Sequence, residues 1–174
     1  DLYHELIMSG ASVEDVILEY PAAARMVGGL RSLASARDMK SAKSMRDVRG
    51  AYLWGESGCG KTTAVYDTFG DSLFRVVTYG TGAWDNYRGE DCIFLDDYAG
   101  QLDLPFLLAL CDHFPLELPA RYANNFAQHT RLVVASNIPW KLMHWEATGE
   151  VRAALERRFE VRREVTAGNV GAVV

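Results

Sequence analysis

The sequence of 174 residues is poor in cysteine and proline, with three and five of them, and it has no long uninterrupted apolar run. The cysteines, Cys59, Cys92 and Cys111, are far apart and form no C-x-x-C pair. Their spacing indicates neither a zinc site nor a disulfide framework, so we expect small buried hydrophobic residues in a reducing compartment. Because no apolar run is long enough to span a bilayer, no membrane partner is expected.

Positive charge is also scarce. The net charge is −5 at pH 7, so no global field draws the chain toward nucleic acid. Contact with a polyanion must therefore be local, or be built by assembling several copies. Closely spaced histidine pairs are missing as well, because the four histidines are isolated from one another at His4, His113, His129 and His144.

The apolar residues that are present follow an α/β pattern. Strand-length runs occur at "AYLW" (51–54), "FRVVTY" (74–79), "CIFLD" (92–96), "RLVVAS" (131–136) and "FEVRRE" (159–164). Between them, "DLPFLLALCDHF" (103–114) is typical of a helix. Strands separated by helices or long connections predict a mostly parallel, buried central sheet with a nucleotide at its carboxyl edge.

Residues 1–48 are predicted to be helical. Ser12 begins a capping box for one helix, and Pro21 marks the start of a second helix, which Gly28 and Gly29 weaken. The basic stretch 31–49 is interpreted as a solvated linker, with a DNA or partner contact as the alternative. We therefore divide the chain into a helical segment with its linker, residues 1–48, and a nucleotide-binding domain, residues 49–174.

The motif "GESGCGKTT" (55–63) matches the phosphate-loop pattern Gly-x4-Gly-Lys-Thr. Its glycines let backbone N–H groups curl around phosphate oxygens, Lys61 adds a positive charge near the β and γ phosphates, and Thr62 offers a hydroxyl to Mg²⁺. The helix predicted for 61–69 presents its N-terminus to the same anion. The expected nucleotide contacts are Gly55, Gly58, Cys59, Gly60, Lys61, Thr62 and Thr63.

Polar residues follow two of the predicted strands. Asp96 and Asp97 end "CIFLDD", where one acid orients hydrated Mg²⁺ together with Thr62 and the other polarises the attacking water. The alternative interpretation is that the two acids form a helix N-cap or a solvated turn. Asn137 ends "VVASN" and is a candidate for contact with the γ-phosphate, although asparagine is also common in turns.

Two arginines, Arg157 and Arg158, lie in "ALERRF" near the end of a predicted helix. They are either partners of the helix dipole or the source of an arginine finger that reaches the nucleotide of a neighbouring subunit. The sequence does not choose between the two residues. A guanine-reading Asn-Lys-x-Asp motif is absent, and no arginine-rich lid of the kind typical of small-molecule kinases is found.

The ordered motifs "GESGCGKTT", "AWDNYRGEDCIFLDD", "LCDHFPLELPARYANNFAQHTRLVVASN" and "ALERRF" resemble the superfamily 3 helicase domain of replication initiator (Rep) proteins. These initiators belong to circular Rep-encoding single-stranded DNA viruses, circovirus-like in particular, and to related plasmids. The resemblance covers about residues 50–165. It implies an AAA+-like P-loop ATPase with an N-terminal oligomerisation segment, which uses ATP and Mg²⁺. It also implies a ring, expected to be hexameric, that moves 3′-to-5′ on single-stranded DNA.

By this resemblance Lys61 and Thr62 belong to Walker A, Asp96 and Asp97 to Walker B, and Asn137 to motif C. The segment 115–129 would then be the B′ hairpin, which points into the ring channel.

In the B′ hairpin, Arg121 stands where circovirus-like relatives carry a lysine followed by two small residues; Tyr122 and Ala123 follow here instead. Arg121 can pair with a phosphate and Tyr122 can stack on a base, and Asn124 completes the predicted DNA contacts. An ordinary polar hairpin is the alternative. No chemistry is assigned to Trp84, Asp85, Tyr87 and Arg88.

Rep proteins of this family also carry an N-terminal nicking domain with a His-hydrophobic-His motif. Without such a pair the chain is expected to lack nicking activity and to be the motor half of a longer protein, with that endonuclease domain as a partner. The expected location is the host nucleus for a eukaryotic virus, or the cytoplasm for a bacterial plasmid or phage.

The predicted function is an ATP-dependent DNA helicase of a rolling-circle replication initiator. Two alternatives stay open: an AAA+ ATPase that remodels or loads proteins without unwinding, and a non-enzymatic oligomerising module that binds DNA.

Overall fold

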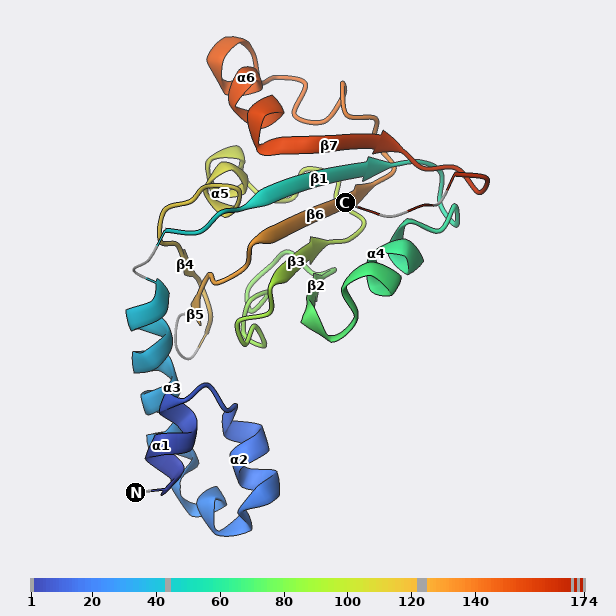
Figure 1. Ribbon diagram of the computed structural model, residues 1–174. Helices are drawn as coiled ribbons and strands as arrows, with labels where there is room; N and C mark the ends of the chain where they lie inside the picture. Colours follow the sequence, from blue (N-terminus) through green and yellow to red (C-terminus); the bar gives the residue numbers. More distant parts are fainter. Residues whose placement is uncertain (1, 43–44, 122–124, 170, 172, 174) are drawn as a thin grey trace. The chain divides into compact units, whose positions relative to one another are not determined.

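A parallel sheet forms the centre of the larger part of the chain. The computed structural model describes residues 2–42, 45–121, 125–169, 171 and 173. Two compact units are present, residues 1–44 and residues 45–174. In the second unit five strands lie in the order β2, β3, β6, β1, β7, and every neighbouring pair is parallel (Figure 1). The predicted α/β fold with a parallel sheet is confirmed.

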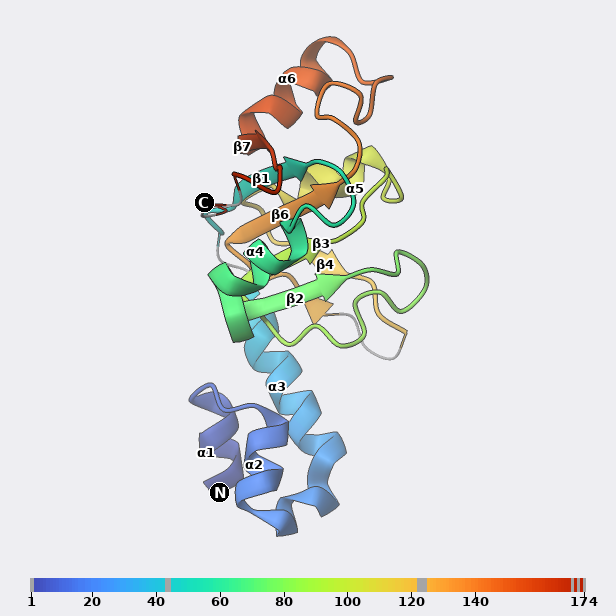
Figure 2. The same cartoon turned by 90° about the vertical axis from the view of Figure 1, so that its right-hand side faces the viewer.

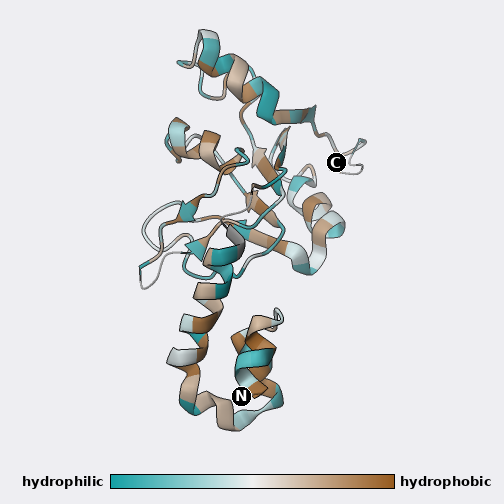
Figure 3. Cartoon of the chain, turned by 60° about the vertical axis from the view of Figure 1, so that its left-hand side comes forward, coloured by the Kyte–Doolittle hydropathy of each residue, from teal (hydrophilic) through white to brown (hydrophobic). Residues whose placement is uncertain are grey.

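The strands coincide with the apolar runs of the sequence. They are β1 (Arg49–Trp54), β2 (Leu73–Val76), β3 (Cys92–Leu95), β6 (Arg131–Ser136) and β7 (Phe159–Glu164). The run predicted to extend to residue 79 ends at Val76, and the chain leaves the sheet there. Hydrophobic residues concentrate in the central strands β1, β3 and β6, which are largely buried, whereas β7 carries four charged residues (Figure 3). Among the described residues, no helix has both the length and the apolar character needed to cross a membrane.

Alternate residues of each strand face opposite sides of the sheet. On β3, Ile93 and Leu95 belong to one apolar cluster, which also holds residues of α5 (Leu104–Leu110) and α6 (Gly149–Arg158). Cys92 and Phe94 belong to the other, together with residues of α4 (Lys61–Phe69). Helices therefore cover both faces, which is why the central strands are apolar throughout rather than alternating.

A two-stranded antiparallel sheet, β4 (Glu117–Leu118) and β5 (Asn125–Phe126), follows α5. The predicted helix 103–114 is therefore too long, since α5 ends at Leu110. The carbonyls of Asp112 and Phe114 instead accept hydrogen bonds from the Arg46 guanidinium, at 3.1 and 3.0 Å. A short 3-10 turn, Gly70–Ser72, connects α4 to β2.

The first unit is a small helical assembly of α1 (Leu2–Met8), α2 (Val13–Glu19), a 3-10 segment (Pro21–Met26) and α3 (Val27–Ala42) (Figure 2). The Ser12 hydroxyl accepts a hydrogen bond from the Asp15 N–H at 3.0 Å, which confirms the predicted cap. The buried residues of its apolar core are Ile7, Val13, Val16, Ala23 and Leu30.

The interpretation of the basic stretch as a solvated linker is wrong for most of its length. Helix α3 continues through residue 42 and contains Gly28 and Gly29 without a break. The Arg37 guanidinium donates hydrogen bonds to the carbonyl oxygens of Ile7 and Ala11, at 2.6 and 3.2 Å. This tertiary contact fixes α3 against α1 and outweighs the weak helix propensity of the two glycines.

Candidate nucleotide site

The phosphate loop connects the end of β1 to the start of α4. Gly58 and Gly60 have φ values of 80° and 97°, a left-handed conformation that glycine adopts without strain. A Cβ at Gly55 would collide with the carbonyl oxygen of Val165. Glycine is thus required at these positions by the backbone itself, and the loop leads into the N-terminus of α4, where anions are favoured.

Lys61 brings the phosphate loop and the end of β6 together. Its side chain is buried, with 7% of the residue exposed. The ammonium group donates to the carbonyl oxygens of Gly55 and Glu56, at 2.8 and 2.9 Å, and to Oδ1 of Asn137 at 3.2 Å. The positive charge is therefore held at the carboxyl edge of the sheet, between the phosphate loop and Asn137.

The two acids after β3 differ in environment. Asp96 is 2% exposed, and its Oδ1 accepts hydrogen bonds from the Thr62 hydroxyl at 3.1 Å and the Asp97 N–H at 3.0 Å. Asp97 is exposed and has a φ of 49°, in the left-handed region. Asp96 is thus fixed beside Thr62, whereas the Asp97 side chain is open to solvent.

Two further residues contact Asp96, and sequence reasoning identified neither of them. The Arg75 guanidinium donates two hydrogen bonds to Oδ2 of Asp96, from Nε at 2.8 Å and from a terminal nitrogen at 2.5 Å. The Tyr79 hydroxyl donates to the backbone carbonyl of Asp96 at 2.7 Å. Burial raises the pKa of Tyr79, and the negative charge of Asp96 raises it further. The available signal for Arg75 was a single charge between the apolar residues Phe74 and Val76.

The oxygen donors at this edge fit a magnesium ion that arrives with a nucleotide. Within the described part of the chain, no group of three or more His, Cys, Asp or Glu side chains can hold a metal. The Thr62 hydroxyl and the Asp96 carboxylate do lie together. Mg²⁺ commonly takes only one or two protein ligands and completes its shell with phosphate oxygens and water.

The cysteines occupy two kinds of environment. Cys92 and Cys111 are buried as expected, and burial raises the pKa of the Cys92 thiol to about 12. Cys59 is only half-buried, so the expectation of burial is wrong for this residue. It lies in the phosphate loop with its sulfur 3.6 Å from Nζ of Lys61, because the backbone curls there.

The two arginines of "ALERRF" end α6 and have different surroundings. Arg158 pairs with Oδ2 of Asp112 at 2.9 Å. Arg157 is exposed. Phe159, which starts β7, is paired with Gly50 near the start of β1. Both arginines therefore lie at the amino edge of the sheet, and the structure does not bring them to the phosphate loop of the same chain.

Arg121 is part of an ion pair outside the nucleotide site. Its backbone N–H and its Nε donate to the Asp85 carboxylate, at 2.9 and 2.6 Å. These hydrogen bonds from Arg121, the backbone one first, lower the pKa of Asp85. Asp85, to which the sequence gave no role, thus holds the backbone and the side chain of Arg121 in place. Tyr122 and Asn124, the other predicted DNA contacts, lie outside the described residues.

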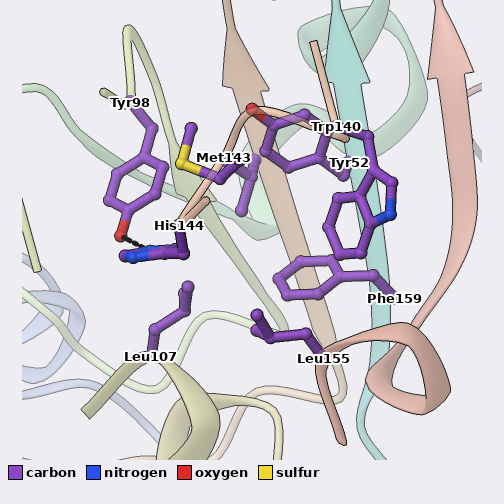
Figure 4. Close-up of a pocket in the computed structure, with 9 residues that line it drawn as sticks. Tyr52, Tyr98, Leu107, Trp140, Met143, His144, Leu155 and Phe159 are labelled. Atoms are coloured by element: carbon purple, nitrogen blue, oxygen red, sulfur yellow. Dashed lines mark hydrogen bonds between the residues drawn. The ribbon is translucent and has the colours of Figure 1, made fainter. Parts of the chain in front are cut away.

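An aromatic core supports the chain that follows Asn137 (Figure 4). The Tyr52 hydroxyl donates to the carbonyl of Ile138 at 2.7 Å, and the Tyr98 hydroxyl lies 2.9 Å from Nε2 of His144. The cavity between these side chains has a volume of about 10 Å³. It has room for one water molecule at most, which is too small for a nucleotide.

A buried pair of an arginine and a histidine lies where the second unit begins. Arg46 is 7% exposed, and one terminal nitrogen lies 3.2 Å from the ring nitrogens of His129. His129 is fully buried. Burial lowers the pKa of His129 to about 4, and the charge of Arg46 contributes in the same direction. The imidazole is therefore neutral in the folded chain at physiological pH.

This burial predicts a stability that depends on pH. The pKa of His129 falls from its ordinary 6.5 to about 4 on folding, so the unfolded chain binds the proton more readily. The contribution of His129 to the free energy of unfolding is present above about pH 6.5 and declines as the pH falls toward 4. We expect the free energy of unfolding to fall by about 2 kcal/mol between pH 7 and pH 5 from this group. Urea unfolding at the two pH values measures it.

The control separates this histidine from the rest of the chain. His129→Gln should be less stable at pH 7 but should lose most of the decline between pH 7 and pH 5. His4→Gln, which changes an exposed histidine, should keep the decline of the unmodified chain. An equal decline in the His129→Gln and unmodified chains would refute the assignment.

Comparison with known proteins connects this geometry to a family. The model of a family described as RNA helicase matches residues 51–138. The chain is 32% identical over 142 residues to the replication-associated protein of Beak and feather disease virus, covering 76% of this chain and 45% of that protein. The corresponding protein of Goose circovirus is 29% identical over 141 residues, covering 75% and 44%. That of Porcine circovirus 1 is 28% identical over 145 residues, covering 82% and 46%. The chain thus spans less than half the length of each of these relatives.

Proposed function

Since the chain belongs to the RNA helicase family, we propose that it is the ATP-driven helicase motor of a replication initiator, acting on single-stranded DNA. Membership of this family implies an ATP-using helicase domain. The observation that carries the proposal is the convergence of Lys61, Thr62, Asp96 and Asn137 at one edge of the sheet. Similarity to viral replication-associated proteins supports a role in replication.

Each residue at this edge then has a defined task. The loop amides and Lys61 bind the β and γ phosphates, with the ammonium exchanging its carbonyl partners for phosphate oxygens. The exposed Asp97 accepts the proton of the attacking water, and Asn137 orients that water or the γ-phosphate. Thr62 and Asp96 would hold Mg²⁺, which supplies neutralisation of the charge that develops on the phosphates.

Hydrolysis on this account requires a neighbouring subunit. Arg157 lies beside the amino end of β1, and the phosphate loop follows the carboxyl end; five residues of strand separate Gly50 from Gly55 by roughly 17 Å. An arginine side chain does not span this distance. Arg158 is held by Asp112, so we propose that Arg157 supplies the finger to the nucleotide of the next subunit.

Assembly also accounts for DNA binding by an acidic chain. A ring, proposed to be a hexamer, presents one Arg121 from each copy to a shared channel, so the local field is positive although each chain carries a net charge of −5. The Arg121 side chain is 55% exposed despite its ion pair. The Asp85 carboxylate keeps the B′ segment in place while the guanidinium meets a phosphate.

The remaining proposals concern the longer protein and its cell. We propose that a nicking endonuclease domain accompanies this motor in a full-length initiator, and that movement is 3′-to-5′. The similar proteins come from viruses of birds and pigs by name, which favours the host nucleus over a bacterial cytoplasm.

Strand displacement tests the proposed function. The chain with ATP and Mg²⁺ should unwind a forked DNA duplex, and it should do so only at protein concentrations that form rings. Unwinding of a forked RNA duplex but not of DNA would overturn the choice of nucleic acid. ATP turnover without any unwinding would instead indicate a protein remodeller or loader, and no turnover at ring-forming concentrations would indicate a non-enzymatic module.

Arg121→Ala should uncouple the motor from DNA. We expect binding to single-stranded DNA to weaken about tenfold or more, because each copy loses a charged contact with phosphate. The stimulation of ATP turnover by DNA should disappear with it. Fluorescence anisotropy of a labelled oligonucleotide measures the first effect.

Arg88→Ala is the matched control for Arg121→Ala. Arg88 is an exposed arginine that also contacts Asp85, through the carbonyl oxygen at 2.9 Å. We expect its loss to change DNA binding less than twofold, since a single exposed charge contributes little. Equal weakening by both substitutions would mean that binding follows total charge and that Arg121 is not the channel contact.

A further inference from the structure

Arg75 places a positive charge beside Asp96 in the nucleotide site. It lies in the middle of the edge strand β2, and its neighbours Phe74 and Val76 belong to the cluster on the α5 face. By strand alternation Arg75 therefore faces the α4 side, where Thr62 also lies. Arg75 is paired with Phe94 on the neighbouring strand β3, and Phe94 lies two residues before Asp96.

The Asp96 carboxylate is fully engaged within the chain. Oδ1 accepts from Thr62 and from the Asp97 N–H, and Oδ2 accepts two hydrogen bonds from Arg75. Only 2% of Asp96 is exposed, so water contributes little to its solvation. A buried carboxylate is tolerated when a positive charge and hydrogen bonds compensate for the lost water, and Arg75 supplies both.

We propose that Arg75 closes the metal site of the nucleotide-free subunit. It pairs with Asp96 and fixes its orientation, and it must withdraw from Oδ2 before that oxygen can serve Mg²⁺ or a water bound to Mg²⁺. This proposal rests on the function proposed above and adds an order of events. Metal alone is kept out, and metal accompanied by a triphosphate displaces the arginine.

Competition follows from charge and from geometry. The guanidinium and a divalent ion are both positive, and both need the same carboxylate oxygen, so the two cannot be accommodated together at close range. A triphosphate shifts the balance because it brings oxygen ligands of its own to the metal. The Arg75 side chain is 39% exposed, so it can move into solvent without crossing the core.

Metal binding without nucleotide tests the proposal. Electron paramagnetic resonance of Mn²⁺ measures the affinity of the nucleotide-free chain for the metal alone. Arg75→Gln, which removes the charge and leaves a shorter polar side chain, should bind Mn²⁺ at least about tenfold more tightly than the unmodified chain. Arg75→Lys keeps the charge and should stay within about threefold of the unmodified chain. Binding by Arg75→Gln that is equal or weaker overturns the proposal.

Two control variants locate the effect. Arg131→Gln removes an arginine from the start of the central strand β6, at the amino ends of the strands, where Arg131 is paired with Cys92, and should leave the Mn²⁺ affinity unchanged. Adding Asp96→Asn to Arg75→Gln should abolish the gain. A gain that survives Asp96→Asn would place the metal elsewhere and refute the assignment.

A second measurement uses the unmodified chain, so it does not depend on whether a variant folds correctly. The Nε–H of Arg75 should be protected from exchange in the nucleotide-free chain and should lose this protection when Mg²⁺ and a slowly hydrolysed ATP analogue are added together. Protection that persists would show that Arg75 does not withdraw. A chain that neither binds nor hydrolyses ATP would defeat the proposed function itself, so the two failures are distinguishable.

Discussion

Lys61→Ala should lower the rate of ATP turnover at least about a hundredfold and weaken ATP binding, because in the proposed function Lys61 supplies the positive charge at the β and γ phosphates. Lys61 is buried and its ammonium group already joins the loop to Asn137. Its loss therefore removes both the charge and the contact between the phosphate loop and Asn137. Turnover is measured by phosphate release, and affinity by titration with a fluorescent ATP analogue.

Lys141→Ala is the control for the Lys61 substitution. Lys141 is an exposed lysine in the segment after Asn137, and its loss should change turnover less than twofold. Thermal unfolding of both variants shows whether the chain remains folded, since alanine at position 61 leaves two carbonyl groups with one partner fewer. A folded Lys61→Ala chain with unchanged turnover would mean that ATP is not bound at this loop.

Arg157→Ala should reduce ATP turnover about a thousandfold while leaving ATP affinity within a few-fold, as expected for a group that stabilises charge in the transition state. Arg157 is exposed at the amino edge of the sheet, away from its own phosphate loop, so in the proposed function it acts on the nucleotide of the next subunit. Turnover at saturating ATP and the dissociation constant of an analogue separate the two effects.

Arg158→Ala should behave differently, although the two arginines are adjacent. Arg158 pairs with Asp112 and joins the end of α6 to the end of α5. Because both side chains are about a quarter exposed, the loss of stability should be only about 1 kcal/mol. If Arg158→Ala abolished turnover in a folded chain while Arg157→Ala did not, the roles assigned to the two arginines would be reversed.

The sequence was sufficient where local patterns decide the structure. The sheet was predictable because its strands are apolar runs of the right length, and the phosphate loop because its glycines are required by the backbone. The cap at Ser12 was predictable for the same reason, since its partner Asp15 is three residues away. Helix α3 was predicted less well, because a contact from Arg37 to Ile7, distant in sequence, stabilises it.

Long-range partners account for what the sequence did not reveal. Asp85 and Arg121 are 36 residues apart, and neither residue alone indicates the pairing. Arg46 and His129 are 83 apart, so the histidine looked isolated. Arg75 was overlooked because a charge on an edge strand is usually solvated. Only the packing of β2 against β3 places it on Asp96.

Cleavage of ATP between subunits is the central claim, and complementation tests it most directly. Lys61→Ala chains retain Arg157, and Arg157→Ala chains retain the phosphate loop, so a mixed ring contains some interfaces with both. An equal mixture that exchanges subunits freely should recover about a quarter of the unmodified turnover, since one interface in about four combines the two intact halves. A mixture as inactive as its components, under conditions where mixed rings form, would contradict the account.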